Sequence, residues 1–240
     1  MIVICNGMLR SGSTLQYNIA AMVLETKYNL ERVGFLGHLI RPKERARLEW
    51  LRQSNRWAIV KTHDPPLPQD FYTDRVHVLF SYRDVRDIAA SIKKKWAYPF
   101  EQILSDLDAT IAIENSFVDI PGVLVQPYDL LFADIASAAR QIAHQLGVAL
   151  ADERVFTIAD FLTAGSRQDD ISGSGYILRR LASRIINRTN YDPETLLHSD
   201  HISASCGNDG DWANQFSASE IDVLNDRYAG WLASHGYPMP

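Results

Sequence analysis

The sequence has few cysteines, no long apolar run and no excess of positive charge, and each absence narrows the possibilities. Two cysteines, Cys5 and Cys206, are too few for a disulfide framework, which favours a reducing compartment and therefore the cytoplasm. No apolar stretch approaches the roughly 18 residues of a membrane span. The chain also opens directly into an apolar strand, so no signal peptide is expected. With a net charge of −5, a broad nucleic-acid surface is not expected.

Short apolar segments alternate with helical patterns along the chain. The segments at residues 1–6, 56–63, 75–84 and 122–129 read as strands. Their alternation with helices predicts βαβ units and a parallel sheet, and such sheets hold ligands at the carboxyl ends of their strands. Because we find no linker or internal repeat, we expect residues 1–240 to form one α/β domain.

The sequence contains a helix-stop signal for one predicted helix and a helix-start signal for another. Gly147 is expected to stop one helix, and Ser217 with Glu220 forms a predicted capping box at the start of another. The predicted helices span residues 13–27, 42–54, 84–95, 99–118, 130–147, 175–188 and 217–236.

The first polar cluster is the stretch GMLRSGSTL. Gly7 and Gly12 stand five residues apart and are followed by a serine and a threonine, as in a phosphate-binding loop. Ser13 occupies the position of the lysine that such a loop uses to bridge the β- and γ-phosphates of ATP, and a cation stands earlier, at Arg10. Main-chain N–H groups and the helix start would still attract an anion. The alternative is an ordinary glycine-rich turn.

The second cluster is KTHD, which ends the second predicted strand and is followed by two prolines. Lys61 and His63 alternate with Thr62, so their side chains are expected on the same side of an extended chain. A histidine at a strand end is a candidate general base because its ordinary pKa of about 6.5 suits neutral pH. The alternative is a surface loop histidine.

The third cluster is SYRDVRDIAAS. Arg83 ends the third predicted strand, and Ser91 follows eight residues later, about two helical turns on. An arginine can make a two-pronged contact with a phosphate, and a serine hydroxyl can add a donor. The alternative is that Arg83 pairs with acidic residues at a solvated helix start. The three clusters together would gather at one sheet edge and predict an anion pocket that contains a base.

The chain resembles the sulfotransferases that use 3′-phosphoadenosine 5′-phosphosulfate (PAPS). Four segments carry the resemblance in the family's order. LRSGST resembles the loop that holds the 5′-phosphosulfate, and KTH before prolines resembles the segment with the catalytic histidine of cytosolic members. YRDVRDIAAS resembles the 3′-phosphate segment, and GNDGDWANQF the C-terminal loop.

The resemblance implies a P-loop NTPase-like fold, with a central parallel sheet between two layers of helices. It implies PAPS as co-substrate, no required metal, and products that include adenosine 3′,5′-bisphosphate (PAP). The implied roles are a 5′-phosphate cradle at Ser11, Gly12, Ser13 and Thr14, charge neutralisation on the leaving phosphate by Arg10, a 3′-phosphate site at Arg83, Ser91 and Gly207, a base at His63, and Lys61 at the bridging oxygen or sulfuryl group.

The chain departs from the family in several places. The usual RKG of the C-terminal loop is Ser205, Cys206 and Gly207, so two cations that hold the 3′-phosphate are missing. The arginine-rich helix at residues 175–188 would replace them, or donor binding would be weaker. Leu15 stands where cytosolic members have an aromatic residue near the adenine. The dimerisation sequence of many relatives is absent, so the oligomeric state stays open.

The sequence also allows several alternatives. A P-loop kinase or nucleotide hydrolase would need a magnesium site, for which only Asp129 is a candidate, and a fold without turnover would be a PAP-binding module. Carbohydrate-directed relatives use a glutamate as base, which makes Glu101 and Glu114 rivals of His63. The HSDH segment at residues 198–201 has spacing that could serve a metal, but loop hydrogen bonding is the alternative.

The sequence leaves the acceptor open among carbohydrate, phenol, lipid and natural-product scaffolds. Its pocket is expected in the segments between the motifs, at residues 30–57, 93–118 and 165–204. Aromatic residues in these segments could stack on a sugar ring or pack in an apolar pocket: Phe35, Trp96, Tyr98 and Tyr176.

Overall fold

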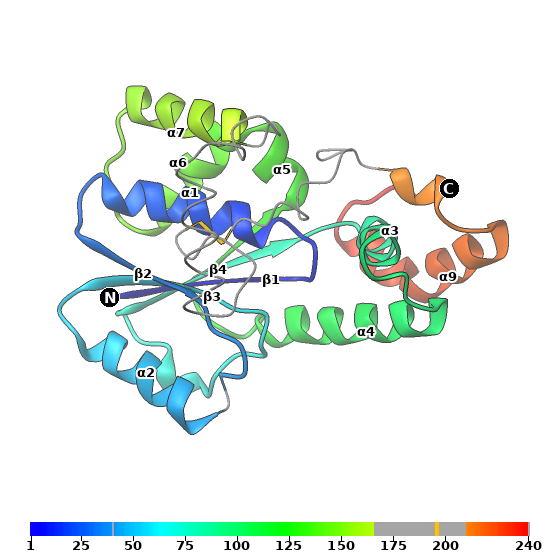
Figure 1. The fold of residues 1–240 in the computed structure, drawn as a ribbon, viewed down its shortest axis with the longest axis horizontal. Helices are drawn as coiled ribbons and strands as arrows, with labels where there is room; N and C mark the ends of the chain where they lie inside the picture. The colour runs from blue at the N-terminus through cyan, green and yellow to red at the C-terminus, as the bar shows by residue number, and fades with distance from the viewer. Residues whose placement is uncertain (40, 166–194, 197–209, 240) are drawn as a thin grey trace, which may run out of the picture.

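The computed structural model describes residues 1–39, 41–165, 195–196 and 210–239. Strands and helices alternate along most of this range (Figure 1). In chain order the elements are β1 (Ile2–Gly7), α1 (Ser13–Glu25), β2 (Leu30–Phe35), α2 (Pro42–Gln53), β3 (Trp57–Lys61), the 3₁₀ helix η1 (Gln69–Phe71), β4 (Val76–Tyr82), α3 (Val85–Trp96), α4 (Phe100–Ser116), β5 (Val123–Pro127), α5 (Tyr128–Ala133), α6 (Ile135–Gln145), α7 (Asp152–Gly165), the 3₁₀ helix η4 (Asp211–Asn214) and α9 (Ala218–Ser234).

The strands form one parallel sheet in the order β2-β3-β1-β4-β5. The predicted α/β class with a central parallel sheet is therefore confirmed. Strand β1 lies between β3 and β4, with Cys5 opposite Lys61 and Gly7 opposite Ser81. The three strands that precede the polar clusters are thus neighbours, and their carboxyl ends meet at one edge of the sheet, as predicted.

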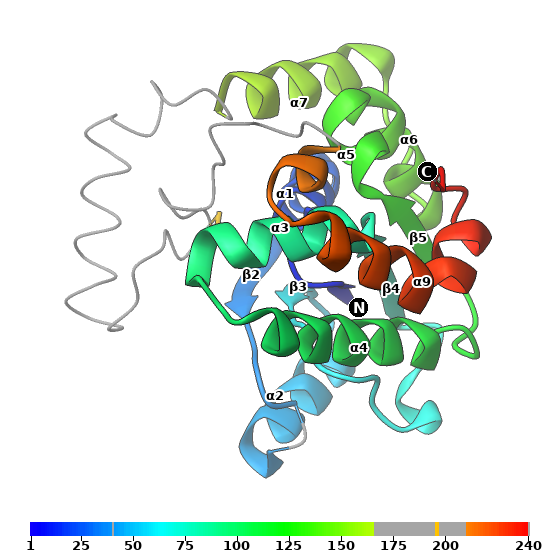
Figure 2. The same cartoon turned by 90° about the vertical axis from the view of Figure 1, so that its right-hand side faces the viewer.

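Helices cover both faces of the sheet (Figures 1 and 2). Helices α1, α5, α6 and α7 lie on one side, and α2 and α4 lie on the other. Helices α3, α4 and α9 pack together beyond the carboxyl end of β4, where they share one apolar cluster. This is the predicted three-layer arrangement, with the α3 end of the molecule projecting past the strand ends.

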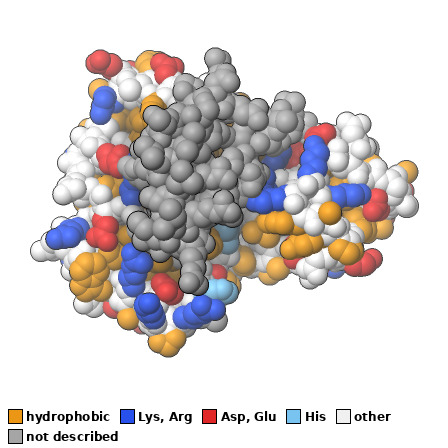
Figure 3. Space-filling view, in the orientation of Figure 1, with side chains coloured by type: hydrophobic (Ala, Val, Ile, Leu, Met, Phe, Trp, Pro, Cys, Tyr) orange, Lys and Arg blue, Asp and Glu red, His pale blue; other side chains and the backbone are white. Residues whose placement is uncertain are grey.

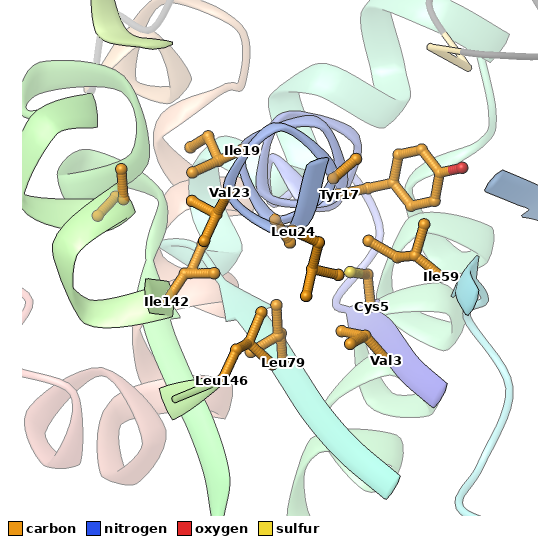
Figure 4. Packing of buried hydrophobic residues seen from close by; sticks show 14 of the residues in the cluster. Val3, Cys5, Tyr17, Ile19, Val23, Leu24, Ile59, Leu79, Ile142 and Leu146 are labelled. Carbon is orange, nitrogen blue, oxygen red and sulfur yellow. The ribbon is translucent and has the colours of Figure 1, made fainter. Parts of the chain in front are cut away.

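Strands β1, β3 and β4 are largely buried on both faces, which explains their nearly continuous apolar sequences. Val3, Cys5, Ile59 and Leu79 point toward α1 and α6, where they meet the apolar side chains that Figure 4 labels. The alternate residues of β1 and β3 pack with α2 instead: Ile2, Ile4, Ala58 and Val60. Burial of each large side chain contributes about 1.5–3 kcal/mol, so this core holds the phosphate loop on a rigid support.

Three elements differ from the sequence prediction. Strand β2 was not predicted, and neither was α7. The single helix predicted over residues 130–147 is wrong, because the chain breaks at Asp134. The Asp134 side chain accepts a hydrogen bond from Ser137 N–H and so caps a new helix, α6. The capping box of Ser217 and Glu220 at the start of α9 is confirmed.

Within the described ranges, no helix is both long and apolar enough to cross a membrane. The predicted helix at residues 175–188 and the segment at residues 198–201 lie outside the described residues.

Candidate functional site

The loop between β1 and α1 requires glycine at both predicted positions. A Cβ on Gly7 would lie 2.8 Å from the carbonyl oxygen of Ser81 and closer still to its hydroxyl, because β1 and β4 run side by side there. Gly12 has a φ of 82°, a left-handed conformation that glycine adopts without strain. A Cβ on Gly12 would also lie 3.1 Å from the ring of Phe132. Gly7 is therefore required by the close packing against β4, and Gly12 by the left-handed backbone conformation at the helix start.

The start of α1 presents unpaired main-chain donors. The first helical hydrogen bond runs from Gln16 N–H to Gly12 O, at 3.0 Å. The N–H groups of Ser13, Thr14 and Leu15 precede it and have no acceptor among the described residues. Since no acidic residue lies in this first turn, the positive end of the helix dipole is uncompensated. This is the geometry of an anion site.

The hydroxyl of Ser11 faces inward, away from such an anion. Ser11 is fully buried, and its Oγ lies 2.7 Å from Met8 O and 2.8 Å from the Ser81 hydroxyl. These bonds fix the loop against β4. We therefore expect the main chain of Ser11, more than its hydroxyl, to contact a ligand.

Arg10 joins two of the predicted clusters. Its Nε donates to the Ser91 hydroxyl at 2.8 Å, across 81 residues of sequence. Its φ of 60° is uncommon for a residue other than glycine, and such strained positions cluster at functional sites. Burial lowers the pKa of Arg10, and the nearby charge of Arg83 lowers it further. The guanidinium is thus held among other cations.

Lys61 and His63 contact each other at the end of β3. His63 Nδ1 lies 2.8 Å from the carbonyl oxygen of Gly7, which can only accept, so Nδ1 carries the proton. His63 Nε2 then has the lone pair of the neutral ring, and it accepts a hydrogen bond of 2.8 Å from the Lys61 ammonium. The pKa of Lys61 is lowered to about 8, chiefly by burial, and the charges of Arg10 and Lys95 act in the same direction.

An exposed aromatic ring borders this pair. Phe35, at the end of β2, is 42% exposed. Its ring centroid lies 6.0 Å from that of His63 and 5.3 Å from Lys61 Nζ. A Cβ on Gly37 would lie 3.1 Å from the same ring, so glycine leaves room for it. Phe35 was a candidate acceptor residue, and it lies beside the candidate base.

Arg83 is buried at the end of β4, where its guanidinium carbon lies 3.9 Å from the ring centroid of Tyr128. Its Nη2 is 3.9 Å from a carboxylate oxygen of Asp87. The same carboxylate oxygen accepts a 3.1 Å hydrogen bond from Gly210 N–H. The end of the GNDGDW segment therefore reaches the Arg83 site, whereas Gly207 lies outside the described residues.

The C-terminal segment is anchored to α3 by a second arginine. Arg86 is almost fully buried, and its side chain donates to Asp84, to Asn225 and to Pro238 O. Its guanidinium carbon also lies 4.4 Å from the Trp212 ring centroid. Arg86 therefore pairs with an acidic residue in the core, and its role is structural.

The rival bases occupy different surroundings. Glu114 is buried, and its two oxygens contact Trp231 Nε1 at 2.6 Å and His235 Nε2 at 2.8 Å, so it serves the packing of α9. Glu101 is exposed in the first turn of α4. In the part of the chain that the structure describes, no three metal-ligating side chains come together.

Lysine and arginine side chains gather on the described surface over α3 (Figure 3). The site thus combines a helix start, two buried cations (Lys61 and Arg83), the half-buried Arg10 and a neutral imidazole at adjacent strand ends. It suits a ligand with more than one anionic group and an attached reacting centre.

No family model and no curated protein matches the chain. Solved structures do. Retinol dehydratase in complex with retinol and PAP aligns at a TM-score of 0.60 and 16% identity, over 100% of this chain and 83% of that one. The chain has the sulfotransferase fold. Mouse sulfotransferase SULT7A1 with PAP aligns at a TM-score of 0.59 and 14% identity, over 97% of this chain and 84% of that one. Retinol dehydratase with androsterone and inactive cofactor PAP aligns at a TM-score of 0.59 and 16% identity, over 96% of this chain and 80% of that one.

Proposed function

We propose that residues 1–240 are one catalytic domain that transfers a sulfuryl group from PAPS to a hydroxyl or amine of a small-molecule or carbohydrate acceptor. The observation that carries the proposal is the meeting of Arg10, Lys61 and Arg83 at neighbouring strand ends, beside an open helix start. The sulfotransferase fold supports it, because the similar structures hold PAP. The scarcity of cysteine supports a cytoplasmic location.

The 5′ side of the donor fits the start of α1. The N–H groups of Ser13 and Thr14 would bind the 5′-phosphate, together with the main chain of Ser11 and Gly12. Arg10 would neutralise the charge that develops on this phosphate when the bond to sulfur breaks.

The 3′ side of the donor fits Arg83 and Ser91. The Tyr128 ring packs against the Arg83 guanidinium. The Ser91 hydroxyl accepts a hydrogen bond from Arg10, whose guanidinium lies near the charge of Arg83. Gly207 belongs to this proposal on sequence grounds. The contact between Gly210 and Asp87 supports it, because it brings the same segment to the Arg83 site.

His63 would remove the acceptor proton. The hydroxyl proton passes to Nε2, the acceptor oxygen forms a bond to sulfur, and the bond from sulfur to the phosphate oxygen breaks with its electron pair on that oxygen. The Gly7 carbonyl keeps Nδ1 protonated, so Nε2 is the basic nitrogen.

Lys61 has to leave this nitrogen before the reaction. In the structure its ammonium donates to His63 Nε2. An anionic donor would draw the ammonium toward the bridging oxygen, which frees the lone pair. The base would therefore become available only once the donor is bound.

Phe35 marks the acceptor side of the base. An exposed ring beside His63 suits the apolar face of a sugar or a planar ring. The similar structures hold retinol and androsterone, which supports acceptors with apolar ring systems.

The rival functions predict different ligands. A kinase or hydrolase needs a cation at the position of Ser13 and a magnesium site, and it would turn over ATP with Mg²⁺. A PAP-binding module would hold PAP without sulfating any acceptor.

The test is transfer of labelled sulfate from PAPS to a panel of phenols, sterols, sugars and amines, with ATP turnover measured in parallel. We expect labelled product from at least one acceptor class and none with a variant that lacks Arg10. Tight PAP binding without any product would favour the binding module, and magnesium-dependent ATP turnover would favour the kinase class.

A further inference from the structure

The hydrogen-bond ladder between β1 and β3 ends just before the candidate base. Its last main-chain bond runs from Thr62 N–H to Cys5 O, at 2.9 Å. Continued parallel pairing would next join Gly7 N–H to Thr62 O. Instead, Gly7 N–H donates to the carboxamide oxygen of Asn6 at 2.7 Å. Among the described strands, β1 pairs from here on only with β4, so the chain around the base needs other contacts to hold it against β1.

The side chain of Asn6 bridges this gap. Asn6 is 1% exposed, and both ends of its carboxamide are bonded. The oxygen accepts from Gly7 N–H, and Nδ2 donates to the main-chain carbonyl of Asp64 at 2.8 Å. Because an N–H group can only donate and a carbonyl oxygen can only accept, these two partners fix which way the amide points. Asn6 therefore connects Gly7 to the residue that follows His63 in the chain.

The Gly7 carbonyl, to which His63 donates, is itself held in place. The N–H of the same peptide unit belongs to Met8 and donates to Ser81 O at 2.9 Å, which makes the carbonyl a better acceptor. His63 Nδ1 donates to this carbonyl at 2.8 Å. The tautomer of the imidazole thus depends on the distance between Gly7 and the chain after β3, and the Asn6 amide spans that distance.

Asp64 extends the connection to the loop after β2. Its carboxylate accepts a hydrogen bond of 2.5 Å from Leu39 N–H, and its own N–H donates to the Thr62 hydroxyl at 3.2 Å. The loops that follow β1, β2 and β3 are therefore joined through Asp64. Since Phe35 lies at the start of the loop after β2, these contacts also support the exposed ring beside the base.

Asn6 would also matter if it only stabilised the fold. Its loss leaves Gly7 N–H and Asp64 O without their partner in a buried place, which lowers the free energy of unfolding whatever His63 does. A role in placing the base predicts something more. It predicts that the ring proton of His63 redistributes between Nδ1 and Nε2 when the Asn6 amide is removed.

We propose that Asn6 is a positioning residue for the base. Its side chain holds Gly7 and Asp64 at the separation that keeps the ring proton on Nδ1 of His63 and the lone pair on Nε2, where the acceptor proton is taken up. The inference rests on the proposed function for the role of the base. Because Asn6 is buried and its hydrogen bonds among the described residues go to main-chain groups, removing it should impair proton transfer more than donor binding.

The test reads the tautomer of His63 by NMR of protein labelled with ¹⁵N in its histidines, since protonated and unprotonated ring nitrogens differ widely in chemical shift. The signals of His63 among the seven histidines are those that disappear in His63→Ala. Lys61 also biases the ring, because its ammonium donates to Nε2, so both proteins of each comparison carry Lys61→Met. Spectra are recorded at about pH 8.5, about two units above the ordinary pKa of a histidine.

In this background the Nδ1-protonated form should predominate, and Asn6→Ala should lower its ratio to the Nε2-protonated form by about fivefold or more. That factor corresponds to the loss of one hydrogen bond of ~1 kcal/mol. Asn6→Ser is the second variant if Asn6→Ala does not fold; its short side chain cannot reach Asp64 O, so it should lower the ratio too. A mainly Nε2-protonated ring before the change, or an unchanged ratio after it, would overturn the proposal.

Asn225→Ala is the matched control. Asn225 is also a buried asparagine, but it lies on α9 and accepts from Arg86 Nη1 at 3.1 Å. Its loss should lower the free energy of unfolding and leave the tautomer ratio of His63 within about twofold, because distant sites act independently. A fall of the same size in Asn225→Ala would overturn the proposal, since the change would then be a general effect of lost stability.

Turnover separates this proposal from the proposed function. With an acceptor that is sulfated, Asn6→Ala in the otherwise unchanged chain should lower kcat by about tenfold or more, while PAP affinity stays near that of the wild type. The loss should be smaller with 4-nitrophenol, which ionises near neutral pH without a base. A loss of PAP affinity without a loss of kcat would place Asn6 in donor binding and overturn the positioning role. If no acceptor is sulfated, the proposed function fails, and the tautomer ratio still decides whether Asn6 positions His63.

Discussion

Replacing Lys61 with methionine should stabilise the folded protein while abolishing its activity. Lys61 is only 7% exposed, and its pKa falls from the ordinary 10.5 to about 8 because the charged ammonium is buried. At ~1.36 kcal/mol per pKa unit, keeping this charge in the folded state at pH 7 costs about 3 kcal/mol. The lost contacts with His63 and the Phe35 ring offset about 1 kcal/mol. The net expected gain is about 2 kcal/mol.

The gain should depend on pH in a defined direction. The folded protein binds the Lys61 proton only below about pH 8, whereas the unfolded chain keeps it up to about pH 10.5. Between these values the unfolded state binds more protons, so the free energy of unfolding of the wild type rises with pH. The advantage of Lys61→Met is therefore full at pH 7, shrinks above pH 8 and is lost by about pH 10.5.

Urea unfolding of both proteins at pH 7 and at pH 9.5 measures this effect. At pH 7 the variant should also melt about 4–8 °C higher than the wild type. Lys43→Met is the control, because Lys43 is exposed on α2 and its replacement should change stability by less than about 0.5 kcal/mol. A variant that is no more stable than the wild type at pH 7, or a gain that stays constant with pH, would show that the buried Lys61 charge does not cost the expected free energy.

Three further predictions concern the loop, the 3′-phosphate and the base. Gly7→Ala should lower the free energy of unfolding by about 1–3 kcal/mol, since its Cβ would overlap Ser81; an unchanged urea midpoint would contradict this. Arg83→Ala should reduce the preference for PAP over adenosine 5′-phosphate by about tenfold or more in calorimetry, and a preserved preference would place the 3′-phosphate elsewhere. His63→Ala should lower kcat by about 10²–10⁴-fold with PAP affinity near that of the wild type. Loss of turnover in Glu101→Ala instead would identify that carboxylate as the base.

The parts of the fold that were predictable are those with strong local signals. The sequence alone predicts β1, β3 and β4 from their apolar runs, and the phosphate loop from its glycines. Because the carboxyl ends of parallel strands lie at one edge of a sheet, it also predicts that the polar residues after these strands lie close together. Strand β2 has no such run: Glu31 and Arg32 interrupt it, Arg32 pairs with Glu25, and the strand exists because it bonds to β3. The position of β2 in the sheet depends on its pairing with β3, which the local sequence pattern does not show.

The details of the site were less predictable than its residues. The sequence indicated Arg10, Ser91, Lys61 and His63, but not that Arg10 would donate to Ser91 or that Lys61 would occupy Nε2 of the imidazole. These contacts depend on side-chain directions that only packing determines. The inward turn of the Ser11 hydroxyl is another case, because it follows from the close approach of β1 and β4.

The most direct test of the account is a comparison of ligand binding by thermal unfolding, with PAP against ATP and Mg²⁺ at equal concentrations. The central claim is that the adjacent ends of β1, β3 and β4 hold an adenosine bisphosphate. A ligand at about 100 times its Kd stabilises the folded state by ~2.7 kcal/mol, which corresponds to a rise in Tm of about 5–10 °C for a chain of this length. We predict such a rise with PAP, a smaller one with ATP and Mg²⁺, and a rise with PAP that falls to about half or less in Arg83→Ala. A larger shift with ATP and Mg²⁺, or no shift with PAP, would contradict the claim.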